Sequence, residues 1–171
     1  ENDYVGVQCM AEQLEVRKRT VKNTKGLVIG IDPDLVKSGV AVVDNGELVR
    51  LYAMSLPELV EFAKCQHLSN SQNIEFIVEE VEADKTTYQR QGTNQHQMRK
   101  IAQNVGQVKG VKRVLVECLQ HEGIPVRLVK PLKGHYKKKA KQDAKFFNQL
   151  TGWAGNSNED KRDAGLLALY G

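Results

Sequence analysis

Four acidic side chains of the sequence could share one site. Asp32 ends an apolar run rich in β-branched residues, and Glu79 follows a second such run. Asp160 and Asp163 lie three residues apart, which places them on one face of a helix. Carboxylate oxygens select hard divalent cations, so we expect Mg²⁺, with Mn²⁺ as its substitute. Two such ions could activate a water molecule and stabilise the leaving oxygen of a phosphodiester.

Each acid also has a purely structural explanation. Asp32 could serve the turn that begins at Pro33, and Glu79 could be a charge on an edge strand. Asp160 could do no more than complement the helix dipole from the first turn of its helix. Asp163 directly precedes the run Ala-Gly-Leu-Leu-Ala-Leu, so it should face the core, where a carboxylate needs a partner.

Two neighbouring acids are rivals for these roles. Glu159 precedes Asp163 by four residues and competes with Asp160, and Glu80 competes with Glu79. In a strand that continues to residue 81, Glu79 and Val81 would point to one face, and Glu80 and Glu82 to the other.

The segments that carry the acids predict an α/β fold with a mixed five-stranded sheet flanked by helices. The first three strands should be antiparallel, since Asp44-Asn45-Gly46 is a strong two-residue hairpin signal. The predicted strands cover about residues 27–32, 39–44, 47–54, 74–81 and 126–129. The predicted helices cover about residues 55–66, 93–120, 136–150 and 159–170.

Length and composition indicate one domain at residues 26–171, preceded by a basic arm or short amphipathic helix at residues 1–25. The 171 residues carry a net charge of +4 and a pI near 8.9, which is mildly basic. No apolar run approaches the ~20 residues of a membrane span. The sequence ends directly behind an apolar helical run, so we expect a longer natural chain, from which a targeting segment or basic tail is missing.

Cysteine usage bears on the compartment. Cys9, Cys65 and Cys118 are odd in number, far apart and without metal-like spacing, which is typical of a reducing intracellular compartment. We expect the cytoplasm or nucleoid, or an organelle matrix or viral factory if a targeting segment is missing.

A basic segment lies shortly before the closing acids. Between residues 130 and 145 the only acid is Asp143, and the segment holds the following basic residues: Lys130, Lys133, His135, Lys137, Lys138, Lys139, Lys141 and Lys145. Such a density suits a phosphate backbone, although a solvated helix face would look the same.

Four motifs, in this order, resemble the RuvC-type Holliday junction resolvases, which have the RNase H-like fold. The opening motif is Gly30-Ile-Asp-Pro-Asp-Leu-Val-Lys-Ser-Gly39, and Phe76-Ile-Val-Glu79-Glu-Val is similar to the second acidic strand of that family. Val105-Gly-Gln-Val-Lys-Gly110 is similar to its long middle helix. Asp160-Lys-Arg-Asp163-Ala-Gly-Leu-Leu-Ala-Leu-Tyr-Gly resembles its closing helix.

The resemblance implies a junction resolvase, an endodeoxyribonuclease that places symmetric nicks in four-way DNA junctions by two-metal-ion hydrolysis and leaves 5′-phosphate and 3′-hydroxyl ends. Its catalytic and metal-binding residues would be Asp32, Glu79, Asp160 and Asp163. Two symmetric nicks from one site per chain imply a homodimer, for which the long helix or the helix at 55–66 would supply the interface. The DNA-binding residues would be Lys85, Tyr88, Arg90, Lys133, Lys137, Lys138, Lys139 and Lys141.

The sequence departs from the bacterial pattern at two positions. Asp34 stands where bacterial members usually have Gly, as in the organellar, plant-type resolvases. Glu82 stands where bacterial members carry an aromatic residue that inserts into the junction. Tyr88 is therefore the candidate for that role in this chain. An exposed tyrosine can stack on a base, but an ordinary loop tyrosine would look the same.

Three other functions fit parts of the pattern. A related RNase H-fold nuclease could act on RNA or on other branched DNA, and a non-catalytic protein could bind junctions with the same surface. Actin-like sugar kinases and ATPases also open with a strand, an Asp and a Gly-rich hairpin. They need a second phosphate-binding hairpin in a second domain, for which this chain is too short.

Overall fold

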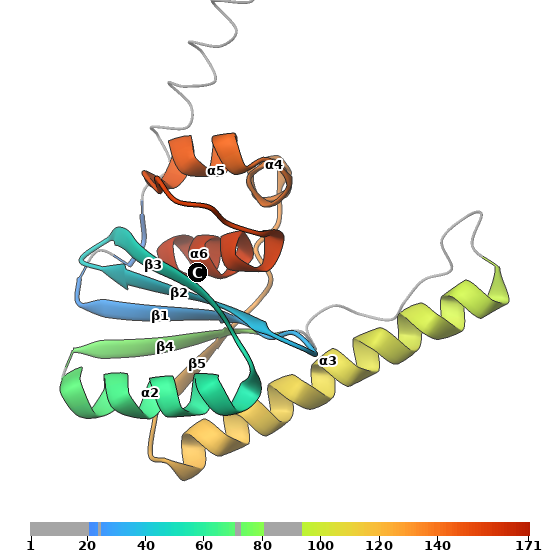
Figure 1. Cartoon of the computed structure of the whole chain (residues 1–171), viewed down its shortest axis with the longest axis horizontal. Helices are drawn as coiled ribbons and strands as arrows, with labels where there is room; N and C mark the ends of the chain where they lie inside the picture. The colour runs from blue at the N-terminus through green and yellow to red at the C-terminus, as the bar shows by residue number, and fades with distance from the viewer. Residues whose placement is uncertain (1–20, 24, 71–72, 81–93) are drawn as a thin grey trace, which may run out of the picture.

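A mixed five-stranded sheet lies at the centre of the computed structural model, which describes residues 21–23, 25–70, 73–80 and 94–171. Its spatial order is β3-β2-β1-β4-β5 (Figure 1). The strands are β1 (Leu27–Asp32), β2 (Ser38–Asp44), β3 (Glu47–Met54), β4 (Ile74–Glu79) and β5 (Val126–Val129). Strands β1, β2 and β3 pair antiparallel, whereas β4 runs parallel to β1 and to β5. The predicted fold class is confirmed.

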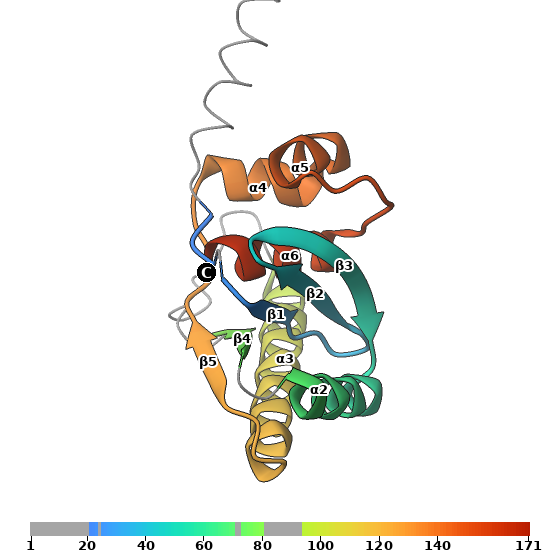
Figure 2. The same ribbon diagram turned by 90° about the vertical axis from the view of Figure 1, so that its left-hand side faces the viewer.

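Helices cover both faces of the sheet. They are α2 (Leu56–Asn70), α3 (Gln95–His121), α4 (His135–Gln142), α5 (Ala144–Thr151) and α6 (Glu159–Tyr170). Helix α6 lies on one face with α4 and α5 stacked outside it, and α2 and α3 lie on the other (Figures 1 and 2). Each face therefore has its own apolar core, one around Phe147 and Leu166 and one around Phe76 and Leu115.

Local sequence signals explain the element ends that were predicted. Asn45 and Gly46 both have positive φ, 47° and 86°, as a tight primed hairpin turn requires. Ser55 begins α2 with both its backbone N–H and its hydroxyl donating to Glu58, each at 2.8 Å. Asn158 caps α6 by accepting a hydrogen bond from the Lys161 N–H at 3.0 Å.

The basic segment forms two helices, so the prediction of one helix over residues 136–150 is wrong. Asp143 is the residue that divides them. It has an extended backbone, and its side chain accepts hydrogen bonds from the N–H groups of Lys145 and Phe146. An Asp competes for backbone donors in this way at a helix start, so α5 begins there and α4 ends. Helix α2 also runs farther than predicted, to Asn70, and β4 ends at Glu79.

Helix α6 is packed directly against the sheet. Its residues Arg162 to Tyr170 are all buried. On β1, a Cβ atom at Gly30 would lie 2.6 Å from the carbonyl oxygen of Ala164. On β2, a Cβ atom at Gly39 would overlap the backbone of Asp160. These two glycines of the opening motif therefore let α6 approach the carboxyl end of β1 with no side chain between them.

The remaining predictions concern the ends, the cysteines and the membrane. Most of the predicted arm, residues 1–20 and 24, lies outside the described residues, as does Cys9. Cys65 and Cys118 are free thiols. In the described part of the chain, no helix is both long and apolar enough for a membrane span.

Candidate metal and nucleic-acid site

Asp32 and Glu79 lie side by side at one edge of the sheet. In the parallel pair β1 and β4, Ile31 is opposite Val78, so both carboxyl groups follow at the same level. Their side chains share a hydrogen bond. Burial, together with the charges of Glu79 and Asp163, raises the pKa of Asp32 to about 8, and burial also raises the pKa of Glu79. The pair therefore retains a proton at neutral pH unless a cation compensates its charge.

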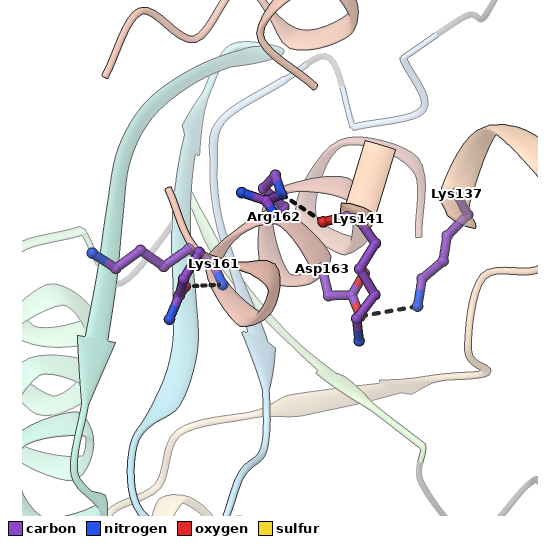
Figure 3. Close-up of polar contacts among 6 residues, drawn as sticks. Lys137, Lys141, Lys161, Arg162 and Asp163 are labelled. Atoms are coloured by element: carbon purple, nitrogen blue, oxygen red, sulfur yellow. Dashed lines mark hydrogen bonds and ion pairs between the residues drawn. The ribbon is translucent and has the colours of Figure 1, made fainter. Parts of the chain in front are cut away.

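Asp163 completes this group from helix α6. It is only 4% exposed, and its Oδ2 accepts from Lys137 Nζ at 3.0 Å and from Lys141 Nζ at 2.6 Å (Figure 3). Its Oδ1 is buried, and none of the described residues donates a hydrogen bond to it. Asp163 thus has one saturated oxygen and one oxygen with unused acceptor capacity.

The two lysines are positioned by α4. They are four residues apart and so lie on one face of the helix, which turns toward Asp163 (Figure 3). Burial opposes the charged form of Lys141, but the hydrogen bond and charge of Asp163 outweigh it and raise the pKa of Lys141. Sequence reasoning assigned both lysines to DNA and missed their ion pairs with Asp163. The sequence did hold a signal for these ion pairs. The two lysines share one helix face and lie shortly before two acids that share another.

Arg162 fastens α4 to α6. It is 6% exposed; its Nε donates to the carbonyl oxygen of Lys141 at 2.7 Å, and its Nη1 donates to that of Ser157 at 2.6 Å. The backbone of α4 is thereby tied beside Asp163 (Figure 3). Sequence analysis gave Arg162 no role, although a charged residue inside a buried helix requires a partner.

Asp160 lies at the outer side of the group. Burial raises its pKa, and the charge of Asp34 adds more to this rise than those of Asp163 and Glu159. The charges that act most strongly on Asp32 belong to Glu79 and Asp163. Asp32, Glu79 and Asp163 thus act on one another electrostatically, whereas the carboxyl group that acts most strongly on Asp160 is Asp34.

Glu80 and Glu159, the alternatives to Glu79 and Asp160, have different surroundings. Glu80 accepts from Lys112 Nζ at 2.9 Å, and Lys112 is a buried residue of α3 on the opposite face of the sheet from α6. Glu159 is exposed in the first turn of α6. The geometry therefore favours Glu79 over Glu80, and the assignment of the four acids stays a prediction.

Comparison with known proteins gave matches among solved structures. No protein-family model and no curated protein matches the sequence. Thermus thermophilus RuvC in complex with a Holliday junction substrate aligns with 84% of this chain and 90% of its own, at 17% identity and a TM-score of 0.50. The chain has an RNase H-like fold.

Two further structures match with lower TM-scores. A second Thermus thermophilus RuvC structure covers 83% of this chain and 90% of its own, at 18% identity and a TM-score of 0.43. Fowlpox virus resolvase in complex with substrate Holliday junction DNA covers 83% and 93%, at 14% identity and a TM-score of 0.40.

The donor set of the RNase H-like domain fits a hard divalent cation. Asp32, Glu79 and Asp163 offer only oxygen ligands, as Mg²⁺ and Mn²⁺ prefer. The buried Oδ1 of Asp163 is the kind of acceptor that such an ion satisfies. Among the described residues, no three acidic, histidine or cysteine side chains are already arranged as a metal site.

The other predicted DNA-binding residues have different surroundings. Lys133 and Lys138 are exposed beside the site, and Lys139 lies over the ring of Phe146, with Nζ 4.6 Å from its centroid. Lys85, Tyr88 and Arg90 lie outside the described residues, as does Glu82. On this RNase H-like domain, the described part of the predicted DNA surface is therefore α4 and the loop before it.

Proposed function

We propose that the chain is a Holliday junction resolvase, a metal-dependent endodeoxyribonuclease that makes symmetric nicks in four-way DNA junctions. The observation that carries the proposal is the meeting of Asp32, Glu79 and Asp163 at one sheet edge, directly beside a lysine-rich helix. Acids alone would repel a phosphate backbone. A cationic helix beside them makes the approach of DNA favourable.

The residues divide the work between them. Asp32, Glu79 and Asp163 would hold the divalent ions, Mg²⁺ or Mn²⁺, with Asp160 joining them. When bound, such ions activate a water molecule and stabilise the leaving oxygen, which yields 5′-phosphate and 3′-hydroxyl ends. Strands β1 and β4 fix two of these carboxyl groups, and α6, held against β1 and β2 at Gly30 and Gly39, fixes the third.

The basic residues would hold the DNA backbone. Lys133 and Lys138 are exposed and would contact phosphates, whereas Lys137 and Lys141 pair with Asp163. Each neutralised phosphate releases counterions, so the affinity for DNA should fall steeply as salt rises. Lys85, Tyr88 and Arg90 would contact the junction nearer its centre.

Symmetric nicking requires two sites, and we infer a two-fold homodimer. Helices α2 and α3 lie on the opposite face of the sheet from α6 (Figure 1). A groove of about 410 Å³ runs between them, and Val105 and Val114 of α3 are 37% and 46% exposed. This surface is the candidate interface, and light scattering at several protein concentrations would give the oligomeric state.

Substrate competition is the test of the proposed function. A labelled four-way junction is offered with an unlabelled junction, a linear duplex or an RNA–DNA hybrid as competitor, with Mg²⁺ or with chelator. A resolvase would nick the junction in paired symmetric positions, only with metal, and only junction competitor would suppress the nicking. Preferred cleavage of the RNA strand would instead assign a different nuclease activity to the same fold.

A further inference from the structure

Ion pairs in the site join residues for which metal binding and phosphate binding are proposed. Lys137 and Lys141 both donate to Oδ2 of Asp163, and Asp163 is 3% exposed at its side chain. The lysine side chains are less buried, at 18% and 34% exposed. Asp163 is a proposed metal ligand, and the lysines are proposed phosphate ligands. The same contacts therefore stand against both binding events.

We propose that Lys137 and Lys141 couple the binding of divalent metal to the binding of DNA. Their ammonium groups compete with a metal ion for Asp163, and DNA phosphates compete with Asp163 for the ammonium groups. DNA therefore releases Asp163 for the metal, and metal releases the lysines for DNA. This inference rests on the proposed function and adds a regulation of its site.

Charge balance explains why the competition is strong. A buried carboxylate is costly without a cation, so Asp163 must be neutralised either by lysine or by metal. Asp32 and Glu79 act on Asp163 as further carboxyl groups at the same sheet edge. A divalent ion would compensate this charge at the buried Oδ1, but the two ammonium groups on Oδ2 repel it and already neutralise the same carboxylate.

The structure also allows the lysines to change partners without unfolding α4. Arg162 holds the backbone of Lys141 through its carbonyl oxygen, so the helix stays in place when the side chain leaves. A lysine has a flexible four-carbon stem with three rotatable donors, which suits movement between two anions. Lys138, one residue from Lys137, is exposed on the same helix, so phosphate can reach this surface.

Coupling of this kind is reciprocal. If junction DNA tightens metal binding by a given factor, metal must tighten junction binding by the same factor. Such couplings typically amount to about 5- to 150-fold. A metal site that fills mainly on DNA would limit hydrolysis to the bound substrate.

The test begins with the protein alone. Isothermal titration with Mn²⁺ is made on the wild-type chain, Lys141→Met, Lys137→Met and Lys141→Arg, with Lys145→Met as the control for a simple loss of charge. Lys145 lies on α5, is exposed, and makes no ion pair with Asp163. We expect the two Met variants at positions 137 and 141 to bind Mn²⁺ at least about fivefold more tightly. Lys141→Arg, which can still pair with Asp163, and Lys145→Met should bind as the wild type does.

The second measurement is the affinity for an immobile junction, by fluorescence anisotropy, with Ca²⁺ or with chelator. Gels of the same samples verify that the DNA stays uncleaved. Ca²⁺ should tighten binding by the wild-type chain at least about fivefold, and by much less in Lys141→Met. Circular dichroism verifies that each variant is folded, and if Lys141→Met is not, Lys137→Met carries the test.

The outcomes separate this inference from the proposed function. Mn²⁺ affinity that is unchanged or weaker in both Met variants would overturn the inference, even if the wild-type chain cleaves junctions. An equal gain in Lys145→Met would also overturn it, because the effect would then be one of net charge. The expected gains in a chain that cleaves no junction would support the coupling and contradict the resolvase activity.

Discussion

Gly39 of β2 lies directly against the backbone carbonyl of Asp160 in α6, with no room for a Cβ atom between them. This contact and the similar one between Gly30 and Ala164 set the position of α6 over the carboxyl end of β1. The distance from the helix to the sheet decides whether Asp163 can reach Asp32. The glycines of the opening motif are therefore part of the site, although they carry no functional group.

Gly39→Ala should lower both stability and cleavage, because the added methyl group meets backbone atoms that cannot move aside separately. Overpacking of this kind costs about 1–3 kcal/mol in the free energy of unfolding. Denaturant unfolding measures it. Gly106→Ala is the matched control, since nothing lies within 4 Å of its Cβ position in α3, and it should stabilise by roughly 0.5–1 kcal/mol. Equal effects of the two substitutions would contradict the role assigned to Gly39.

Stability without metal should fall as pH rises. The folded-state pKa of Asp32, about 8, lies above its unfolded value, so its contribution is complete below pH ~4 and is lost as pH rises through 8. Within this window the loss is at most about 1.4 kcal/mol per pH unit. Thermal melts in chelator between pH 5 and 9 measure it.

Asp32→Asn isolates this effect, because the amide cannot ionise. Relative to the wild-type chain, the variant should gain stability in chelator as pH rises toward about 8 and then level off. The gain should shrink in Mg²⁺, which would bind the wild-type site and stabilise it. A stability difference that does not depend on pH would show that Asp32 is already ionised and compensated in the fold.

The acids at the end of β4 should behave differently from one another. Glu79→Gln should abolish cleavage, since Glu79 lies beside Asp32, whereas Glu80→Gln should retain it, since Glu80 faces Lys112. Glu80→Gln should instead lower stability by up to about 3 kcal/mol, because it replaces a charged hydrogen bond to the buried Lys112 with a weaker neutral one. Junction cleavage and thermal unfolding of both variants test this, and the reverse result would exchange the two assignments.

Replacement of Lys137, Lys138 and Lys139 by Ala should weaken junction binding and flatten its salt dependence. The slope of log affinity against log salt should decrease by about 2 to 3, close to one for each lost phosphate contact. Anisotropy titrations at several salt concentrations measure it, with Lys145→Ala as the control. An unchanged slope would mean that the lysine-rich segment is only a solvated face.

The strands and the places of Asp32 and Glu79 at their ends were predictable because the signals are local. The run that ends at Asp32, the turn at Asn45-Gly46 and the cap at Asn158 each specify structure within a few residues. The meeting of Asp32 and Glu79 followed from parallel pairing alone, since strands that run the same way end at the same edge.

What the sequence did not reveal depends on tertiary packing. The break at Asp143 arises because its side chain caps α5, which helical periodicity does not show. The ion pairs of Lys137 and Lys141 depend on how α4 lies on α6, and Arg162 sets that placement. A pattern read from residue types could place these lysines near DNA, but it could not show that Asp163 holds them.

The most direct test of the resolvase proposal compares the wild-type chain with Asp32→Asn on one labelled immobile four-way junction in Mg²⁺. We predict paired symmetric nicks by the wild-type chain and at least about a hundredfold less cleavage by the variant. In chelator, the junction affinity of the variant should lie within about threefold of that of the wild type, since Asp32 is a proposed metal ligand and not one of the proposed DNA contacts. Undiminished cleavage by the folded variant, or tight junction binding by a wild-type chain that makes no nicks with metal, would contradict the proposal.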